Sequence, residues 1–327
     1  MLSTLSASLI GQKSTTYALK ALTIDEGLMG RGETKVSRHV FAMALNLILF
    51  HQILRRVPSA RAYLRDRLKA GHQIFLDHGA LRTVDLGSDS PMNGYASFAR
   101  ILEPLGYQVA DIYPLEALKM TGRGFCHVDF PDTLSQFFVS ELHTARFSPD
   151  FQIVAKRVFG SPKDALTAQT LTILDAFKHK QAVSLSEASL ALKSVVKAFS
   201  RRHKIAHIDD YQALLSDSKE AAWIATEGSD FNHATDRVAD LDAIVAFERL
   251  QGRQVKDMIE VSASGRVCQT ALKADPVVRR FKSDKGLIKQ SVPGSFFEFI
   301  SRARQADGRL DLRFDSSNAQ AIFKMTA

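Results

Sequence analysis

A short sequence pattern occurs twice in this chain, and it constrains the fold more than any other feature. The first copy runs from His78 to Val84 and contains Arg82. A shorter second copy, which contains Arg237, runs from His233 to Val238 and begins 155 residues later (233 − 78 = 155). Both copies are predicted to be β-strands, in which residues four apart share a face and lie about 13 Å from one another. Each His is therefore expected to point the same way as its Arg.

The elements that follow the two copies repeat as well. A turn-rich loop and a helical pattern over residues 95–105 follow the first copy, and a helical pattern over 241–250 follows the second. Strands are predicted at 77–85, 107–113, 124–130 and 136–143, and again, with one additional strand, at 231–238, 258–262, 266–272, 277–282 and 295–302. The predicted fold class is α+β, in which two βαβββ units form a cupped mixed sheet around a shared hollow.

Helical patterns occupy the remaining sequence. They are predicted at residues 17–22, 35–56 and 60–69, and again at 151–159, 163–179, 185–201 and 208–225. We expect a single domain over residues 1–327. Its parts are a helical cap (1–72), the first unit (73–148), a helical insertion (149–227), the second unit (228–304) and a tail (305–327).

A carboxylate completes a possible metal site. Glu298 lies among aromatic residues in the late segment 293–299, on a third predicted strand. Together with His78 and His233 it forms a set of two histidines and one carboxylate, which leaves three positions open on an octahedral metal and is typical of non-haem Fe(II) oxygenases. The alternative is that these are three unrelated polar residues. The matched positions of the two histidines favour the metal site.

Glu141 is a candidate fourth ligand by pseudo-symmetry. It follows His78 by 63 residues (141 − 78 = 63), while Glu298 follows His233 by 65 (298 − 233 = 65). A structural role as the partner of an arginine is the favoured alternative for Glu141.

The two arginines of the repeat receive different interpretations. A guanidinium can bind a carboxylate through paired hydrogen bonds that lysine cannot reproduce. Arg82 is therefore predicted to hold an acidic substrate, whereas Arg237 is expected to form a structural ion pair, for instance with Asp236 or Glu141.

Charge and cysteine content restrict the partners and the compartment. The net charge of +8 suits anionic partners, but the basic residues occur as isolated pairs and not as a stripe interleaved with aromatics, so nucleic-acid binding is not expected. Cys126 and Cys268 have no CxxC spacing, which favours a reduced, cytoplasmic setting and argues against metal ligation by cysteine.

The longest apolar run gives no reason to expect a membrane segment. Residues 40–54 include Asn46, His51 and Gln52 and fall short of the roughly 20 residues that a span needs. We predict a buried helix there, and the N-terminal 16 residues lack the pattern of a signal peptide.

Five short motifs connect the chain to a known family. They are His-Gly-Ala-Leu-Arg at 78–82, Phe-Val-Ser-Glu-Leu at 138–142, Asn-His-Ala-Thr at 232–235, Gln-Thr at 269–270 and Pro-Gly-Ser-Phe-Phe-Glu-Phe at 293–299. In these motifs, over roughly residues 72–304, the chain resembles the 2-oxoadipate dioxygenase/decarboxylase (hydroxyglutarate synthase) family. That family is a distant branch of the vicinal-oxygen-chelate superfamily, which also contains glyoxalases and extradiol dioxygenases.

The resemblance implies a set of roles for residues of this chain. Fe(II) would be held by His78, His233 and Glu298, Arg82 would bind the substrate carboxylate, and Gln269 would also contact the substrate. The implied reaction consumes O2 and a 2-oxo dicarboxylic acid such as 2-oxoadipate, and gives a 2-hydroxy acid such as 2-hydroxyglutarate and CO2. The best-understood members are longer, with C-terminal residues that shape the substrate pocket, so the substrate is less constrained than the metal.

Two other functions remain open. One is a glyoxalase-like lyase or isomerase that uses Glu141 as a fourth ligand to a redox-inert metal; dependence on oxygen would separate it from the oxygenase. The other is a non-catalytic basic binding protein, for which tight, salt-dependent DNA binding by metal-free protein would be the evidence.

Overall fold

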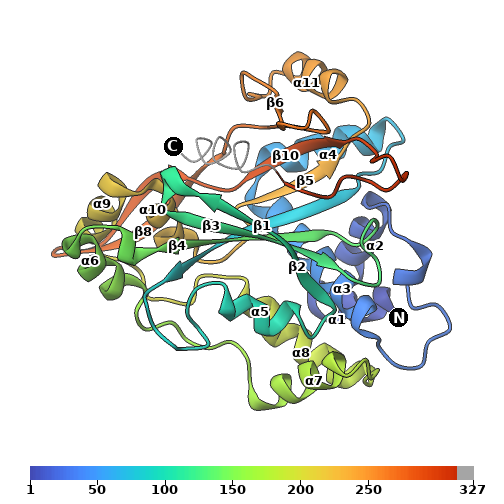
Figure 1. The fold of residues 1–327 in the computed structure, drawn as a ribbon, viewed down its shortest axis with the longest axis horizontal. Coiled ribbons are helices and arrows are strands. Elements are labelled where there is room, and N and C mark those ends of the chain that lie inside the picture. The colour runs from blue at the N-terminus through green and yellow to red at the C-terminus, as the bar shows by residue number, and fades with distance from the viewer. Residues whose placement is uncertain (315–327) are drawn as a thin grey trace.

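A curled, mixed sheet of eight strands forms the centre of the molecule (Figure 1). The computed structural model describes residues 1–314. The sheet has the order β2-β3-β4-β1-β5-β10-β7-β6. Its strands are β1 (Leu76–Asp85), β2 (Tyr107–Leu115), β3 (Met120–His127), β4 (Gln136–His143), β5 (His233–Arg237), β6 (Glu260–Val261), β7 (Val267–Ala271) and β10 (Phe296–Arg302).

Helices cover both faces of this sheet, and the α+β class predicted from the sequence is confirmed. The helices are α1 (Leu2–Ile10), α2 (Gln12–Ala21), α3 (Arg38–Arg56), α4 (Pro58–Lys69), α5 (Ala96–Leu102), α6 (Pro149–Phe159), α7 (Ala168–Lys178), α8 (Leu185–Ala198), α9 (Ile208–Asp217), α10 (Lys219–Glu227) and α11 (Leu241–Leu250). In Figure 1 helices α1, α2, α3, α7 and α8 lie below and to the right of the sheet, α4 lies at the upper right beside β5 and β10, and α6, α9 and α10 gather at the left end.

The alternation of side chains along each strand separates two hydrophobic cores. Leu81 and Phe137 point into one core with α3 and α8, whereas Ala80 and Phe138 point into the other with α6, α9 and α10. Since both faces are covered, β1 is buried over nearly its whole length. A polar side chain on β1 is thus removed from water and needs a partner or a function.

The long apolar run of the sequence is a buried helix, as predicted. Helix α3 buries 14 side chains, and Pro58 begins α4 immediately after it. Within residues 1–314, no single helix is long and apolar enough to span a membrane; α3 and α4 reach that length and composition only as a pair bent by 112°.

The two units are related by a pseudo-twofold axis at the centre of the sheet. Strands β1 and β5 are antiparallel, with His78 opposite Thr235 and His233 opposite Ala80. Each of these strands pairs in parallel with the last strand of its own unit, β1 with β4 and β5 with β10. The register therefore places the two histidines in equivalent positions beside the axis.

Three details of the fold differ from the sequence prediction. The strand expected at 277–282 (β8, Pro276–Ser283) pairs with the unpredicted β9 (Gly286–Pro293) in a separate two-stranded sheet inserted between β7 and β10. Helix α1 was not predicted. The single helix expected at 208–225 is divided at Ser218, whose hydroxyl accepts from the N–H of Ala221 and so starts a new helix.

The glycine that follows His78 makes room for a core aromatic ring. A Cβ atom at Gly79 would lie 2.1 Å from the ring of Phe231. Because no side chain fits there, Phe231 can pack directly against the backbone of β1 beneath the predicted site.

Candidate metal centre

The structure brings His78, His233 and Glu298 together from three neighbouring strands. The Oε2 atom of Glu298 lies 3.2 Å from Nε2 of His78 and 3.5 Å from Nε2 of His233. The two Nε2 atoms are 3.3 Å apart. Ligand atoms at roughly 2.1 Å from one ion lie roughly 3.0–3.4 Å from each other in octahedral or tetrahedral geometry, so the spacing fits a single metal.

A hydrogen bond fixes the orientation of the His78 ring. Its Nδ1 lies 2.9 Å from Oδ1 of Asp77, which can only accept, so Nδ1 carries a proton and Nε2 faces the cluster. Neighbouring side chains of a regular strand point to opposite faces, but the ladder between β1 and β5 is irregular from Leu76 to His78. This irregularity accompanies the contact between two consecutive residues.

Asp77 is itself held by two arginines. Arg237 donates to its Oδ2 at 2.6 Å, and the buried Arg302 donates to both carboxylate oxygens. The expectation that Arg237 forms a structural ion pair is confirmed, but its partner is Asp77 and not Asp236 or Glu141. Asp236 instead accepts from the hydroxyl of Tyr63.

Thr235 is a site residue that the sequence analysis missed. Its hydroxyl donates to Oε2 of Glu298 at 2.6 Å and lies 3.1 Å from Nε2 of His78. The signal was present in the repeat, because Thr235 is two residues after His233 and shares its face of β5. The hydroxyl orients the carboxylate toward the two imidazoles.

The protonation of His233 and Glu298 suits a cation, whereas at His78 burial acts to lower the pKa but hydrogen bonds with Asp77 and Glu298 outweigh it and raise that pKa. Burial lowers the pKa of His233 to about 3, although the charge of Glu298 acts in the opposite direction. Burial acts to raise the pKa of Glu298, but the two histidines outweigh it and hold that pKa below its usual value. A neutral imidazole and an ionised carboxylate are the forms that bind metals.

Two buried atoms of the cluster are unsatisfied by protein groups. Among residues 1–314, Nδ1 of His233 and Oε1 of Glu298 have no hydrogen-bond partner. A buried carboxylate is unfavourable unless a positive charge compensates for it. The donor set, its spacing and its burial therefore fit a divalent metal.

Arg82 lies on the same face of β1 as His78 and is fully buried. Its guanidinium carbon is 5.0 Å from the centre of the Trp223 ring on α10. Burial lowers the pKa of Arg82 to about 10, with Glu220 opposing, so the group stays charged at neutral pH. That charge contributes to the low pKa of His233, so Arg82 is electrostatically coupled to the cluster.

Glu141 lies outside the cluster. Its carboxylate accepts from Arg123 and from the N–H of Tyr95, both at 2.8 Å. The interpretation as the partner of an arginine is confirmed. The register also shows why the fourth-ligand interpretation is wrong: Glu298 is opposite Thr235, and the equivalent pair in the first unit is Phe138 opposite Ala80.

Gln269 lies on the same face of the sheet as Glu298. It is opposite Ile300 in the ladder between β7 and β10, two residues along from Ala271, which is opposite Glu298. Its side chain is buried, and Nε2 donates to Glu260 at 3.3 Å.

The last described residues of the chain pack against the cluster on the side of the first unit. The ring of Phe314 packs edge-on against His78, with 4.8 Å between ring centres, and also contacts Phe138. The backbone N–H of Phe314 donates to the hydroxyl of Tyr113. This part of the predicted tail thus returns to the sheet, and residues 315–327 lie outside the described residues.

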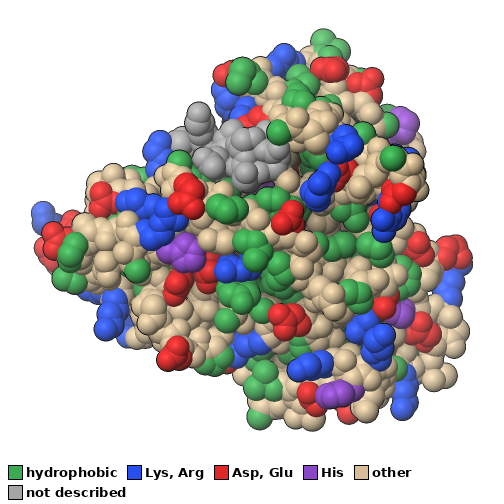
Figure 2. All heavy atoms as spheres, viewed as in Figure 1, with side chains coloured by type: hydrophobic (Ala, Val, Ile, Leu, Met, Phe, Trp, Pro, Cys, Tyr) green, Lys and Arg blue, Asp and Glu red, His purple; other side chains and the backbone are tan. Residues whose placement is uncertain are grey.

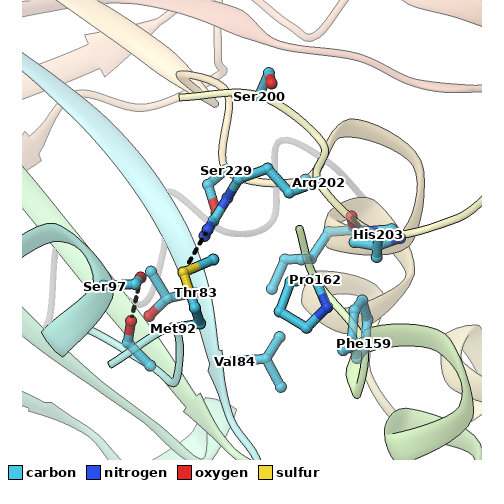
Figure 3. Close-up of a pocket in the computed structure, with 13 residues that line it drawn as sticks. Thr83, Val84, Met92, Ser97, Phe159, Pro162, Ser200, Arg202, His203 and Ser229 are labelled. Atoms are coloured by element: carbon cyan, nitrogen blue, oxygen red, sulfur yellow. Dashed lines mark hydrogen bonds between the residues drawn. The ribbon is translucent and has the colours of Figure 1, made fainter. Parts of the chain in front are cut away.

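A small pocket near the C-terminal end of β1 is separate from these residues (Figure 3). It has a volume of about 50 Å³, and none of the residues predicted for the site is among those that line it. Nη1 of Arg202 points to the sulfur of Met92 across it, at 3.3 Å. On the outer surface shown in Figure 2, basic and acidic side chains are interspersed.

A known protein family matches most of this chain. The model of the family described as 2-oxoadipate dioxygenase/decarboxylase matches residues 47–321. The chain belongs to the 2-oxoadipate dioxygenase/decarboxylase family. The resemblance seen in the five motifs is thereby confirmed.

A curated rice protein is a more distant relative of this chain by sequence. A curated rice protein (Oryza sativa subsp. japonica), "2-oxoadipate dioxygenase/decarboxylase, chloroplastic/amyloplastic", is 26% identical over 269 residues, which are 76% of this chain. The match spans 65% of the length of that rice protein.

Two solved structures share the whole architecture. A protein from Ralstonia eutropha JMP134 that is assigned to the glyoxalase superfamily is 42% identical, with a TM-score of 0.91 and coverage of 96% of this chain and 98% of the other. Hydroxyglutarate synthase from Oryza sativa, solved in complex with 2-oxoadipate, has a TM-score of 0.69 at 22% identity and covers 94% and 95% of the two chains. The latter similarity shows the shared fold alone.

Proposed function

We propose that this chain is a non-haem Fe(II) oxygenase that decarboxylates a 2-oxo dicarboxylic acid of the size of 2-oxoadipate and releases a 2-hydroxy acid of the size of 2-hydroxyglutarate and CO2. The observation that carries the proposal is the convergence of His78, His233 and Glu298 on a scaffold of the 2-oxoadipate dioxygenase/decarboxylase family. Family membership supports the reaction class, and the donor set supports metal-dependent chemistry.

The three side chains would hold the metal from one side. Two imidazoles and one carboxylate leave open positions for a chelating acid and for O2, and a bound Fe(II) supplies the redox chemistry. The protein contributes the orientation of its ligands through Asp77 and Thr235. Burial of all three ligand side chains keeps water away from the site.

Arg82 would bind the carboxylate of the acid that is distant from the metal. A guanidinium offers two parallel N–H donors to a carboxylate, and burial strengthens that interaction. The rings of Phe314 and Phe138 form an apolar wall on the first-unit side of His78. Gln269 is a further candidate substrate contact on the opposite side of the cluster.

A turnover assay tests the proposal. The protein is loaded with Fe(II) and given a panel of 2-oxo mono- and dicarboxylates, in air and under strict anaerobiosis. We expect one O2 consumed and one CO2 released per acid, with no requirement for separate 2-oxoglutarate. Product formation that continues without oxygen would overturn the oxygenase and favour a glyoxalase-like lyase or isomerase.

Metal analysis tests the ligand set independently of turnover. We expect one divalent metal per chain, and less metal in His78→Ala, His233→Ala and Glu298→Ala. Three variants that bind metal like the wild-type protein would overturn the assignment.

A further inference from the structure

We propose that Lys256, Glu260 and Gln269 form a positioning relay, in which the Lys256–Glu260 ion pair fixes the carboxamide of Gln269 toward the metal-proximal end of the substrate. This inference rests on the proposed function. It concerns the side of the cluster opposite to Arg82, where the chain places a buried ion pair.

The relay is continuous in hydrogen bonds. Nζ of Lys256 forms an ion pair with Oε1 of Glu260, and Oε2 of Glu260 accepts from Nε2 of Gln269 at 3.3 Å. The side chains of Lys256 and Glu260 are only 15% and 8% exposed, and Gln269 is 3% exposed. An ion pair that is so well shielded from water needs precise partners, and few surface pairs are held this way.

The register places the relay and Arg82 on opposite sides of the cluster. His78, Thr235 and Glu298 form one row across the strands, and Ala271 extends this row onto β7. Arg82 lies four residues from this row in one direction along the strands, and Gln269 lies two residues from it in the other. At about 3.3 Å per residue these offsets are roughly 13 Å and 7 Å.

The chemistry of Glu260 determines which atoms Gln269 presents. A carboxylate only accepts hydrogen bonds, so it selects the amide orientation in which Nε2 faces Glu260. The second N–H of the Gln269 amide is then directed away from Glu260. Lys256 balances the charge of Glu260, so that the relay does not repel an anionic substrate.

Contacts with both ends of the substrate would define the class of substrate. A 2-oxo dicarboxylate that chelates the metal through its oxo acid end can direct its other carboxylate to Arg82. The second N–H of Gln269 would donate to the carboxylate nearest the metal. A site of this kind recognises the separation of two carboxylates, and the relay contributes the fixed point at the metal.

Substrate affinity without turnover tests the relay. Fe(II)-loaded Glu260→Gln, Gln269→Leu and the double variant are titrated anaerobically with 2-oxoadipate, by calorimetry and by the visible absorbance of the complex. We expect each single variant to bind about tenfold more weakly with unchanged metal content, because one oriented hydrogen bond is lost. The double variant should bind no more weakly than Gln269→Leu, since Glu260 acts through Gln269.

A matched control separates positioning from stability. Glu248 on α11 is another buried glutamate in an ion pair, with Arg253, and lies outside the cluster. Glu248→Gln should lower thermal stability and leave substrate affinity unchanged. Wild-type affinity in Glu260→Gln and Gln269→Leu, or additive losses in the double variant, would overturn the relay while aerobic turnover by the wild-type protein still supported the proposed function.

Discussion

The carboxylate of Asp77 holds the ring of the residue that follows it, with Oδ1 2.9 Å from Nδ1 of His78. Through this contact Asp77, Arg237 and Arg302 determine where Nε2 of His78 points. The orientation of a candidate ligand thus depends on a buried charge cluster behind it.

Asp77→Asn is expected to weaken metal binding by about 10- to 100-fold, the range found when such supporting carboxylates are changed. Asparagine can keep the hydrogen bond but removes the charge that supports the imidazole. Competition with a chelator measures the metal affinity, and unchanged affinity would mean that the ring is oriented by other contacts.

Thr235→Val should also weaken metal binding, because valine has the same shape and lacks the hydroxyl that donates to Glu298. We expect a loss of roughly tenfold. Thr83→Val is the matched control, since Thr83 is a buried threonine of β1 whose hydroxyl donates to a backbone carbonyl. Equal metal affinity in the two variants would argue against a role for Thr235.

Arg82→Lys keeps the charge and loses the paired donors. We expect kcat/KM to fall by about 10- to 100-fold or more with metal content unchanged, since a charge-assisted hydrogen bond contributes about 1.5–3 kcal/mol. Arg237→Lys is the comparison. Because Arg237 holds Asp77, its main expected effect is on stability and metal affinity. Wild-type kcat/KM in the Arg82→Lys variant would show that another group binds the substrate.

Glu141→Ala should retain its metal, in contrast to Glu298→Ala. Removal of Glu141 leaves the largely buried Arg123 without its carboxylate, so the free energy of unfolding is expected to fall by roughly 1–3 kcal/mol. Thermal denaturation and metal analysis of the same samples test this. Loss of metal from Glu141→Ala alone would restore Glu141 as a ligand.

Stability of the metal-free protein is expected to fall as pH rises from about 4 to about 7 because of Asp236. Burial raises the pKa of this carboxyl to about 7, although Tyr63 opposes the shift. Between the unfolded pKa of about 3.9 and the folded value, the folded state holds a proton that the unfolded state has released, so raising pH favours unfolding. Asp236→Asn should reduce this pH dependence. Urea denaturation at pH 5 and pH 8 measures it, and an unchanged pH dependence in the variant would contradict the assignment.

The central strands and the candidate site could be predicted from the sequence because the repeat indicates where the strands lie and which side chains share a face. Once His78 and His233 are equivalent residues of paired strands, their proximity follows from the period of two. Glu298 could also be predicted as a site residue, because a single carboxylate in a strand of aromatic residues needs a buried partner.

The contacts that orient those residues could not be predicted, since they depend on register. The irregularity that accompanies the contact between Asp77 and His78 has no sequence signature. The intervals between His and Glu are similar in the two units, but Glu141 does not occupy the register position that corresponds to Glu298. Only one strand of the β8–β9 hairpin was predicted, for another reason. Both strands are largely exposed, so the alternation of hydrophobic and polar residues along them is weak.

The equivalence of Phe138 and Glu298 has a consequence for chirality. A symmetric pair of carboxylates would enclose a cation equally from both units, but here one unit presents an anion and the other an aromatic ring. An acid bound at such a centre would meet two unlike walls and keep one prochiral face toward the metal. If the proposed reaction takes place at this centre, we expect its product to be a single enantiomer of the hydroxy acid.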